Sequence, residues 1–314
     1  MREDFIKAFG YGFHCNSGAF YLDPKKPVEM AVITHAHADH AVAGHRIVYC
    51  TPVTRKLMEE RYGLNCAGRF FEKSFGEPFN INGITVTFYP AGHILGSAQV
   101  LMESEEVKYL YTGDFKLQED QTCEAFQHVE TDVLYTESTF GNKDVSHPSA
   151  LEQLKNILAP ERNQNVMIGA YTLGKAQRIT AMLGQHFPER PLMVHPAIAR
   201  YHRIYEFERV SLGEWAPYNR SNLEKQKDCI YLVPPSIYAR YQNNPFFIKA
   251  FATGWANYHL KSDVPLRISD HADWEDLLVL ISRSKARRIF TLHGDGSELV
   301  KHFSGSKIKV TELR

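Results

Sequence analysis

The stretch "THAHADH" at 34–40 constrains this chain more than any other part of its sequence. It follows a short apolar run and contains four side chains of metal-ligand type, His35, His37, Asp39 and His40. Side chains two positions apart in an extended segment point to the same side, so His35 and His37 can bind one ion. Asp39 and His40 come where the chain turns, and they can face a second ion. Imidazole and carboxylate ligands suit zinc, and also manganese or iron.

Four ligands cannot complete two metal sites, so further ligands must come from elsewhere in the chain. His93 lies between two glycines in "AGHILG", as a residue of a tight ligand loop would. Apolar runs typical of strands end at His35, Asp114, Glu137 and His293. In layered α/β folds, reactive residues gather where strands end and loops begin. We therefore expect these residues to line one shared site.

Helical patterns lie between the strand-like runs. "SALEQLKNILAP" at 149–160 spaces its leucines on one helical face, and "LGKAQRITAMLGQHF" at 173–187 follows the strand-like "NVMIGAY" at 165–171. This combination of strands and helices indicates an α/β protein.

Composition limits the class of protein and its location. Of the 314 residues 44% are hydrophobic, enough for a packed core, and the formal net charge is +0. Residues 146–262 hold 14 Lys and Arg against 8 Asp and Glu, which indicates either phosphate contacts or an ordinary solvated surface. The N-terminus has no long apolar run, and the five scattered cysteines form no CxxC pair. We therefore expect a cytoplasmic protein with reduced thiols and no membrane segment.

Over nearly its whole length, the sequence resembles the metallo-β-lactamase fold, and more narrowly its β-CASP nuclease branch. In chain order, the matching motifs contain Asp23, His35, His37, Asp39, His40, His93, Asp114, Glu137, His271 and His293. "GAYTLGKAQRI" at 169–179 is similar to the start of a helix in the inserted cap of that branch. The bacterial DNA ligase-associated exonucleases are the most similar group, because they also carry "THAHADH", "AGHILGSAQV", "TGDFK", "TESTFG" and "SDHADW".

The resemblance implies a specific architecture. Residues 1–145 and 263–314 would form an αββα metallo-β-lactamase sandwich, and residues 146–262 would form an inserted β-CASP-like α/β cap. The site would lie in the cleft between the sandwich and the cap.

The resemblance also implies a site with two divalent ions, zinc first and manganese or iron as alternatives. Its ligands would be His35, His37 and His93 for one ion, Asp39, His40 and His293 for the other, and Asp114 between them. Asp23 would support the ligands without binding metal. Asp39 is also one of the three residues expected to take part in catalysis, with Glu137 and His271.

His271 lies in "SDHADW", whose letters resemble the metal motif "THAHADH". The two ions have their ligands without His271. Cleavage of a phosphodiester still requires a proton for the leaving alkoxide, and a histidine is well suited to donate one. The resemblance assigns this role to His271, with Glu137 orienting the ring. Asp270 and Asp273 either share that role or cap the helix that begins near Trp274.

These features predict a nuclease, namely a DNA exonuclease of DNA repair. The histidine at the last motif, His293, favours RNA instead, so an RNA-processing enzyme of the mRNA 3′-end type is an alternative. A glyoxalase II-like hydrolase of small molecules would not need Glu137, His271 or a cap, and a non-catalytic module should lack ligands. The family's genomic setting implies a functional association with a DNA ligase and a helicase.

Three cations are candidates for phosphate contacts. They are Lys116, two residues after Asp114, and Lys175 and Arg178 in "LGKAQR". An ordinary surface charge is the alternative for each.

Overall fold

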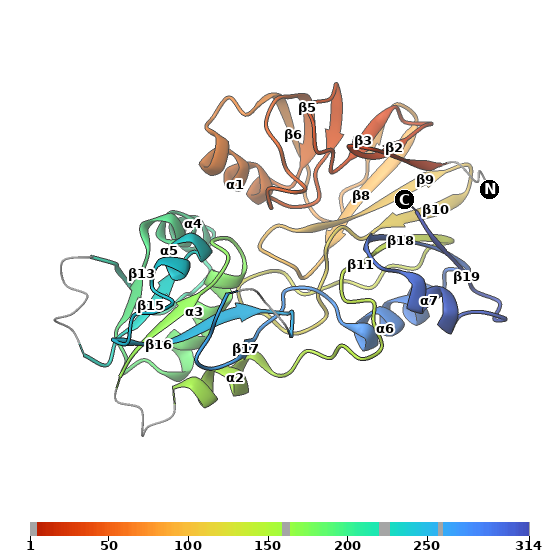
Figure 1. The fold of residues 1–314 in the computed structure, drawn as a ribbon. Helices are drawn as coiled ribbons and strands as arrows, with labels where there is room; N and C mark the ends of the chain where they lie inside the picture. Colours follow the sequence, from red (N-terminus) through yellow and green to blue (C-terminus); the bar gives the residue numbers. More distant parts are fainter. Residues whose placement is uncertain (1–4, 159–163, 220–226, 257–259, 314) are drawn as a thin grey trace. The chain divides into compact units, whose positions relative to one another are not determined.

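The computed structural model describes residues 5–158, 164–219, 227–256 and 260–313. The chain divides into two compact units (Figure 1): the first comprises Met1–Ser146 and His271–Arg314, the second His147–Asp270. The second unit extends beyond position 262, where the predicted cap ends, because the short strand β17 (Leu266–Arg267) pairs with β16 (Phe247–Thr253). The α/β class predicted from the sequence is confirmed.

The first unit contains two β-sheets. In spatial order, one consists of β1 (Ile6–Phe9), β2 (Gly12–Cys15), β3 (Phe20–Leu22), β4 (Met30–Val32), β5 (His45–Cys50) and β6 (Ala67–Glu72). The other consists of β19 (Lys309–Glu312), β18 (Arg288–Gly294), β11 (Val133–Ser138), β10 (Val107–Tyr111), β9 (Ala98–Ser104), β8 (Ile84–Pro90) and β7 (Phe79–Ile81). Phe20 and Leu22 of the first sheet share one buried apolar cluster with Val86 and Val100 of the second. The two sheets are therefore packed face to face.

Helices cover the outer faces of this sandwich. They are α1 (Pro52–Tyr62) against β6 in the first sheet, and α6 (Trp274–Ser284) and α7 (Ser297–His302) against the second sheet. Leu277 and Leu280 of α6 pack against Leu101 and Leu134. The resulting order is helix, sheet, sheet, helix, which is the αββα sandwich expected from the resemblance.

The second unit is built around one parallel sheet. Its strands are, in spatial order, β14 (Ala216–Pro217), β13 (Leu192–Val194), β15 (Ile230–Val233), β12 (Asn165–Gly169), β16 and β17. Its helices are α2 (Ala150–Ile157), α3 (Lys175–His186), α4 (Pro196–Phe207) and α5 (Pro235–Arg240). No helix in the ranges described above is long and apolar enough to cross a membrane.

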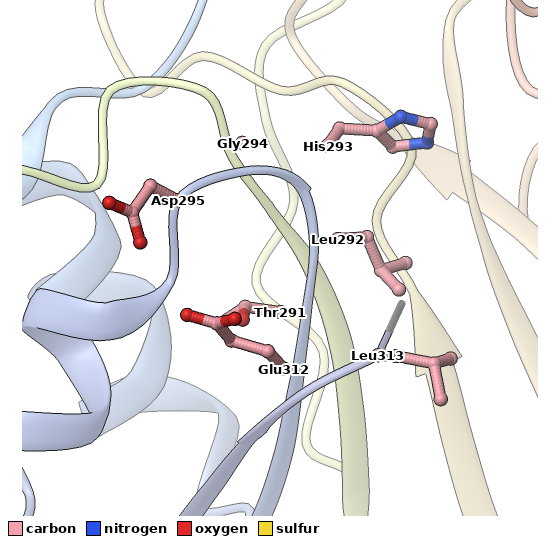
Figure 2. Close-up of a pocket in the computed structure, with 7 residues that line it drawn as sticks. All are labelled: Thr291, Leu292, His293, Gly294, Asp295, Glu312 and Leu313. Carbon is pink, nitrogen blue, oxygen red and sulfur yellow. The ribbon is translucent and has the colours of Figure 1, made fainter.

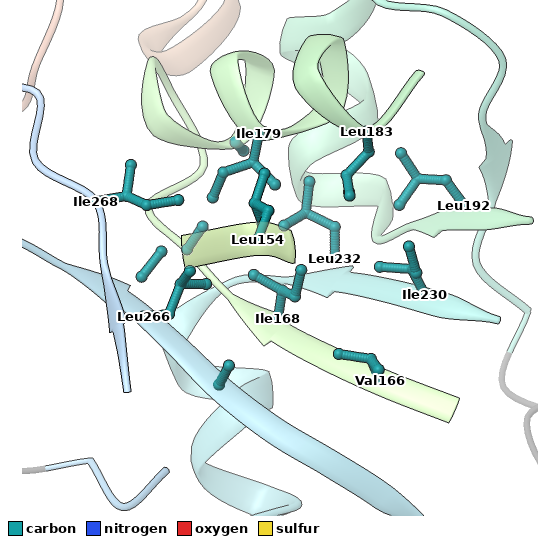
Figure 3. Close-up of a cluster of buried hydrophobic side chains, with 14 of the residues drawn as sticks. Leu154, Val166, Ile168, Ile179, Leu183, Leu192, Ile230, Leu232, Leu266 and Ile268 are labelled. Atoms are coloured by element: carbon teal, nitrogen blue, oxygen red, sulfur yellow. The ribbon is translucent and has the colours of Figure 1, made fainter. Parts of the chain in front are cut away.

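Side chains alternate across this parallel sheet, so both of its faces are buried. On one face Ile168 and Leu232 meet Ile179 and Leu183 of α3, together with residues of α2 and α4 (Figure 3). On the other face, Tyr238 of α5 joins a cluster of mostly aromatic side chains. This arrangement is an α/β unit with helices on both sides of the sheet, as predicted for the cap.

A buried histidine, His202, joins α3 to α4. The amide nitrogen of Gln177 lies 3.0 Å from its Nδ1, and the hydroxyl oxygen of Thr180 lies 2.8 Å from its Nε2. Because Thr180 donates its own proton to the carbonyl of Ala176, the Nε2–H of His202 must be the donor to Thr180. The ring is therefore neutral, and its burial lowers its pKa to about 3.

Candidate metal centre

Strand direction brings four of the predicted residues to one edge of the sandwich. β10, β11 and β18 run parallel to one another, so their carboxyl ends coincide. Asp114 follows β10, while Glu137 and His293 lie in the last residues of β11 and β18. In the other sheet His35 follows β4. The strands predicted before these four residues are confirmed.

Asp23 fixes the loop that carries the first histidines. Its carboxylate accepts hydrogen bonds from the backbone N–H of Thr34 at 2.8 Å and from the Thr34 hydroxyl at 2.7 Å. The same carboxylate lies 2.9 Å from Nδ1 of His40. Asp23 is buried and has a left-handed backbone (φ 43°), a strained conformation for a non-glycine residue. These contacts orient His40 so that its Nε2 points toward Asp114.

Three imidazole nitrogens crowd together beside Asp114. Nδ1 of His37 lies 3.2 Å from Nε2 of His35 and 3.0 Å from Nε2 of His93. Ligands at ~2.0–2.1 Å from a tetrahedral zinc ion lie about 3.3 Å from one another, so this spacing fits a metal site. Oδ2 of Asp114 is 3.6 Å from His35 and 3.8 Å from His93. The four ligand atoms lie within 4.8 Å of one another.

The residues predicted for the second ion gather around His40. Oδ2 of Asp114 is 3.3 Å from Nε2 of His40, which is 3.8 Å from the exposed carboxylate of Asp39. The ring centroids of His40 and His293 are 5.0 Å apart. One oxygen of Asp114 thus faces histidines of both predicted sets, as a bridging ligand would.

Backbone strain turns His293 toward this cluster. Its backbone is left-handed (φ 46°), and the register between β11 and β18 shifts at Glu137 and Ser138. Figure 2 shows the consequence: the imidazole points away from Thr291 and Glu312, which line a cavity of about 360 Å³ beside it. His293 is thus one of the residues that line this cavity, while its ring lies beside that of His40 in the metal cluster.

Glu137 holds His271 at the edge of the cluster. Oε2 of Glu137 lies 2.9 Å from Nδ1 of His271, while Oε1 accepts a hydrogen bond from the backbone N–H of Phe115 at 2.8 Å. Nδ1 of His271 is also 3.9 Å from Oδ2 of Asp114. The ring of His271 is one-quarter exposed, whereas Glu137 is buried. A buried carboxylate that accepts from Nδ1–H leaves Nε2 as the nitrogen that exchanges a proton.

Charges within the cluster alter its proton affinities. Burial and the neighbouring imidazoles of His40 and His93 hold the pKa of His35 well below its ordinary value. Burial alone would also lower the pKa of His40, but the carboxylates of Asp114 and Asp23 raise it well above the ordinary value. Crowded imidazoles around a carboxylate are an arrangement that a bound cation stabilises.

Asp270 and Asp273 flank His271 but have other contacts. Oδ1 of Asp273 accepts from the backbone N–H of Asp276 at 3.2 Å, so Asp273 caps α6. Within the second unit, the carboxylate of Asp270 lies 3.7 Å from Nζ of Lys175 and 3.6 Å from the guanidinium of Arg178. These two cations therefore face a carboxylate of their own unit, and their predicted phosphate contacts stay predictions.

The predicted phosphate contact of Lys116 does not agree with its position. Its side chain is fully buried, and Nζ lies 2.6 Å from Oδ2 of Asp120. A lysine enclosed in this way has its charge compensated inside the protein, so its phosphate contact stays a prediction. The sequence placed Lys116 near the site because it follows Asp114 closely, but the chain turns its side chain inward.

The chain has similarity to known nucleases and to a ligase. No family model matches it. It is 30% identical over 310 residues to a probable DNA ligase of Opitutus terrae, covering 93% of this chain and 29% of that protein. It is 30% identical over 206 residues to the endoribonuclease YSH1 of Mycosarcoma maydis, covering 52% of this chain and 23% of that protein. These similarities agree with the resemblance of the chain to the β-CASP branch of the metallo-β-lactamase family. The chain spans less than a third of the length of these two relatives.

A solved structure has a fold similar to that of this chain. A protein of unknown function from Enterococcus faecalis V583 matches it with a TM-score of 0.60 and 14% sequence identity. The match covers 90% of this chain and 78% of the other. At this identity the likeness concerns the fold alone.

Sequence reasoning missed Tyr111 as a member of the centre. Its hydroxyl donates to Oδ2 of Asp23 at 3.2 Å and lies 3.4 Å from Nε2 of His293. Burial, together with the charges of Asp23 and Asp114, raises the pKa of this phenol well above its ordinary value. Its position in "YLYTGD" could have indicated this role. Tyr111 is the last residue of the strand that leads to Asp114, so its side chain lies near the metal cluster.

Proposed function

We propose that this protein is a metal-dependent phosphodiesterase that cleaves nucleic acid, and that it acts as a DNA exonuclease in DNA repair. One observation carries the proposal: the Glu137–His271 pair lies directly beside Asp114, with 2.9 Å between carboxylate and ring nitrogen. Activation of water at a metal centre does not require such a pair. Departure of an alkoxide from a phosphodiester benefits from one, because the leaving oxygen needs a proton.

In this proposal two divalent ions would be held by His35, His37, His93, Asp39, His40, His293 and Asp114. Zinc suits this set of imidazole and carboxylate donors, and manganese or iron are the alternatives. When bound, such ions would lower the pKa of an attacking water and would compensate charge on the phosphoryl oxygens.

The protein's own residues complete the reaction. Asp23 keeps His40 oriented, and the backbone N–H of Phe115 keeps Glu137 oriented. Glu137 favours the protonated form of His271, whose Nε2 then donates its proton to the leaving oxygen. The attacking water loses one proton to solvent, and its oxygen forms a bond to phosphorus while the ester bond breaks. The products are a phosphate monoester and an alcohol. This assistance is worth roughly 10²–10⁴ in rate.

We favour DNA over RNA because of the length of the match to the ligase. The similarity to the probable DNA ligase extends over 93% of this chain, whereas the similarity to the endoribonuclease covers 52%. A segment that occurs within a ligase chain is expected to act on the same nucleic acid as the ligase. RNA processing of the mRNA 3′-end type is the second candidate, supported by His293 at the last motif and by the endoribonuclease similarity. Because of the similarity to a DNA ligase, we also propose that the protein is associated with a DNA ligase and a helicase. As expected from the sequence, we propose that it is cytoplasmic.

A cleavage assay tests this function. The purified, metal-loaded protein is incubated with end-labelled single- and double-stranded DNA and RNA, with zinc, manganese and iron compared. Progressive shortening of DNA from an end is expected. Faster cleavage of RNA would support the second candidate, and no cleavage of any strand would reject a nuclease and favour a small-molecule hydrolase.

Two variants test the role of His271. The variant His271→Ala should keep both metal equivalents and lose most of its cleavage activity. The matched control His186→Ala removes an exposed histidine at the end of α3. It should change neither the metal content nor the cleavage activity. Because Asp114, Glu137 and His271 together are also close enough to hold an ion, loss of one metal equivalent in His271→Ala would make His271 a ligand and not an acid.

A further inference from the structure

We propose that an exposed aromatic face on β1, β2 and β3 binds the bases of an unpaired nucleic-acid strand. This inference rests on the proposed nuclease function and adds a surface that positions the substrate. The aromatic face consists of Phe9, Tyr11, His14 and Tyr21, with Lys7 beside them.

Strand register places these side chains together. Lys7 pairs with His14, and His14 pairs with Tyr21, so the three lie side by side across the sheet. Phe9 is two residues from Lys7 on the same strand and therefore points to the same face. The ring of His14 lies 4.5 Å from that of Tyr21 and 5.8 Å from that of Phe9. Tyr11 completes the face from the turn, with its hydroxyl 3.0 Å from that of Tyr21.

These rings are not part of the hydrophobic core. The alternate side chains Phe20 and Leu22 enter the core between the two sheets, which leaves the aromatic face on the outside. Phe9 is 46% exposed, and Tyr11, His14 and Tyr21 are partly exposed. Rings held by one another but open to solvent form a ready surface for stacking, because every base has an apolar face of similar size.

The charge of the region complements a nucleic acid. Lys7, Lys25 and Lys26 are exposed. The backbone N–H of Lys25 donates to the carbonyl of Tyr11 at 2.6 Å, which brings this lysine beside the aromatic face. Between residues 5 and 26 the sequence has one acidic residue, Asp23, and that side chain is buried against Thr34 and His40. Bases can therefore stack on the rings while lysines contact the phosphates.

The aromatic face is connected to the metal centre through β2. Phe13, the neighbour of His14, projects from the opposite side of this strand, and its ring lies 5.5 Å from that of His293. β2 thus contributes to the wall of the centre on one side and to the aromatic face on the other. A strand bound to this face therefore lies on the same β-strand that borders the metal centre.

A binding experiment tests the proposal in metal-loaded protein that carries His271→Ala, so that the strand stays intact. Fluorescence anisotropy measures the affinity for a labelled single strand of thymidines and for a strand of equal length without bases. Phe9→Ala and Tyr21→Ala should each weaken binding of the thymidine strand about 5- to 100-fold, and should leave binding of the abasic strand nearly unchanged.

Two control variants separate stacking from other effects. Tyr21→Phe keeps the ring and loses the hydroxyl contact, so it should bind like the parent protein. Phe207→Ala removes a ring that is 73% exposed on α4 of the other unit, and it should also bind like the parent. Circular dichroism of each variant establishes that the sandwich is folded.

The outcomes distinguish this inference from the proposed function. If the wild-type protein cleaves nucleic acid but Phe9→Ala and Tyr21→Ala bind thymidine strands normally, the aromatic face is not a binding surface. The same conclusion follows if both strands lose affinity equally, because bases are then not involved. If binding depends on the rings as expected but the wild-type protein cleaves nothing, the surface stands and the nuclease function is wrong.

Discussion

The ion pair between Lys116 and Asp120 provides a direct test of whether this lysine serves the structure or the substrate. Lys116 follows the predicted bridging ligand Asp114 by two residues, yet its side chain is fully buried and lies 2.6 Å from Asp120. Oδ1 of Asp120 also accepts from the backbone N–H and the hydroxyl of Thr122, at 2.9 and 2.6 Å. This carboxylate therefore ties together the segment that follows Asp114.

The loss of folding stability expected when either partner is replaced follows from this burial. Asp120→Asn keeps an acceptor for Thr122 but places an amide N–H₂ against the ammonium of Lys116, which leaves a buried charge uncompensated. Such a change costs about 3–5 kcal/mol, a large share of the ~5–15 kcal/mol by which a domain is usually stable. Lys116→Met keeps the length of the side chain and removes the charge, and Asp120 retains Thr122. A smaller cost of about 1–3 kcal/mol is expected for that variant.

Urea unfolding followed by circular dichroism measures both costs, and cleavage of labelled DNA is measured on the same preparations. Asp120→Asn should unfold at a distinctly lower urea concentration than Lys116→Met, with an unchanged slope of free energy against urea. The reasoning is refuted if Lys116→Met is as stable as the wild type but has lost cleavage. Lys116 would then be a phosphate contact, as the sequence suggested.

Three further predictions concern the two units. Since the folded protein holds His202 neutral with a pKa of about 3 while the unfolded chain protonates near 6.5, stability should fall as pH drops below about 6.5. The loss is about 2 kcal/mol at pH 5, and urea unfolding of His202→Gln should show a flatter dependence on pH. Asp114→Ala should disturb both metal sites together, because its carboxylate faces histidines of both sets; two tightly bound metals by elemental analysis would contradict a bridging role. Gly169→Ala should cost about 1–3 kcal/mol by thermal unfolding, because its Cβ would come within 2.5 Å of Phe251 and 2.6 Å of Tyr238. Unchanged stability would show that these rings can move aside.

Strand ends were the most predictable part of this protein. An apolar run that stops at a polar ligand-type residue predicts a strand, and it also predicts the edge of the sheet at which the side chain of that residue lies. The strands before Asp114, Glu137 and His293 are all observed. Parallel pairing then brings those ends together without further information. The pairing of Glu137 with His271 could be anticipated only from the family resemblance, because 134 positions separate them.

Side-chain direction in loops could not be predicted in the same way. Lys116 lies beyond the end of β10, where no period of two or 3.6 residues indicates the direction of a side chain, and it turns inward to Asp120. The backbone of Asp23 and His293 is left-handed, which a sequence pattern does not reveal for residues other than glycine. At both positions the strained backbone directs a functional side chain, and contacts from distant segments hold it there.

The order of these residues along the chain explains how an insertion of this size is tolerated. All the predicted ligands and the Glu137–His271 pair belong to the first unit, although the chain leaves it at Ser146 and returns at His271. Glu137 comes before this excursion, and His271 is the first residue after it. The pair is therefore formed by the two chain segments that bracket the second unit. Its 2.9 Å contact joins two residues of the first unit, so the insertion adds chain length between Glu137 and His271 without contributing to the pair itself.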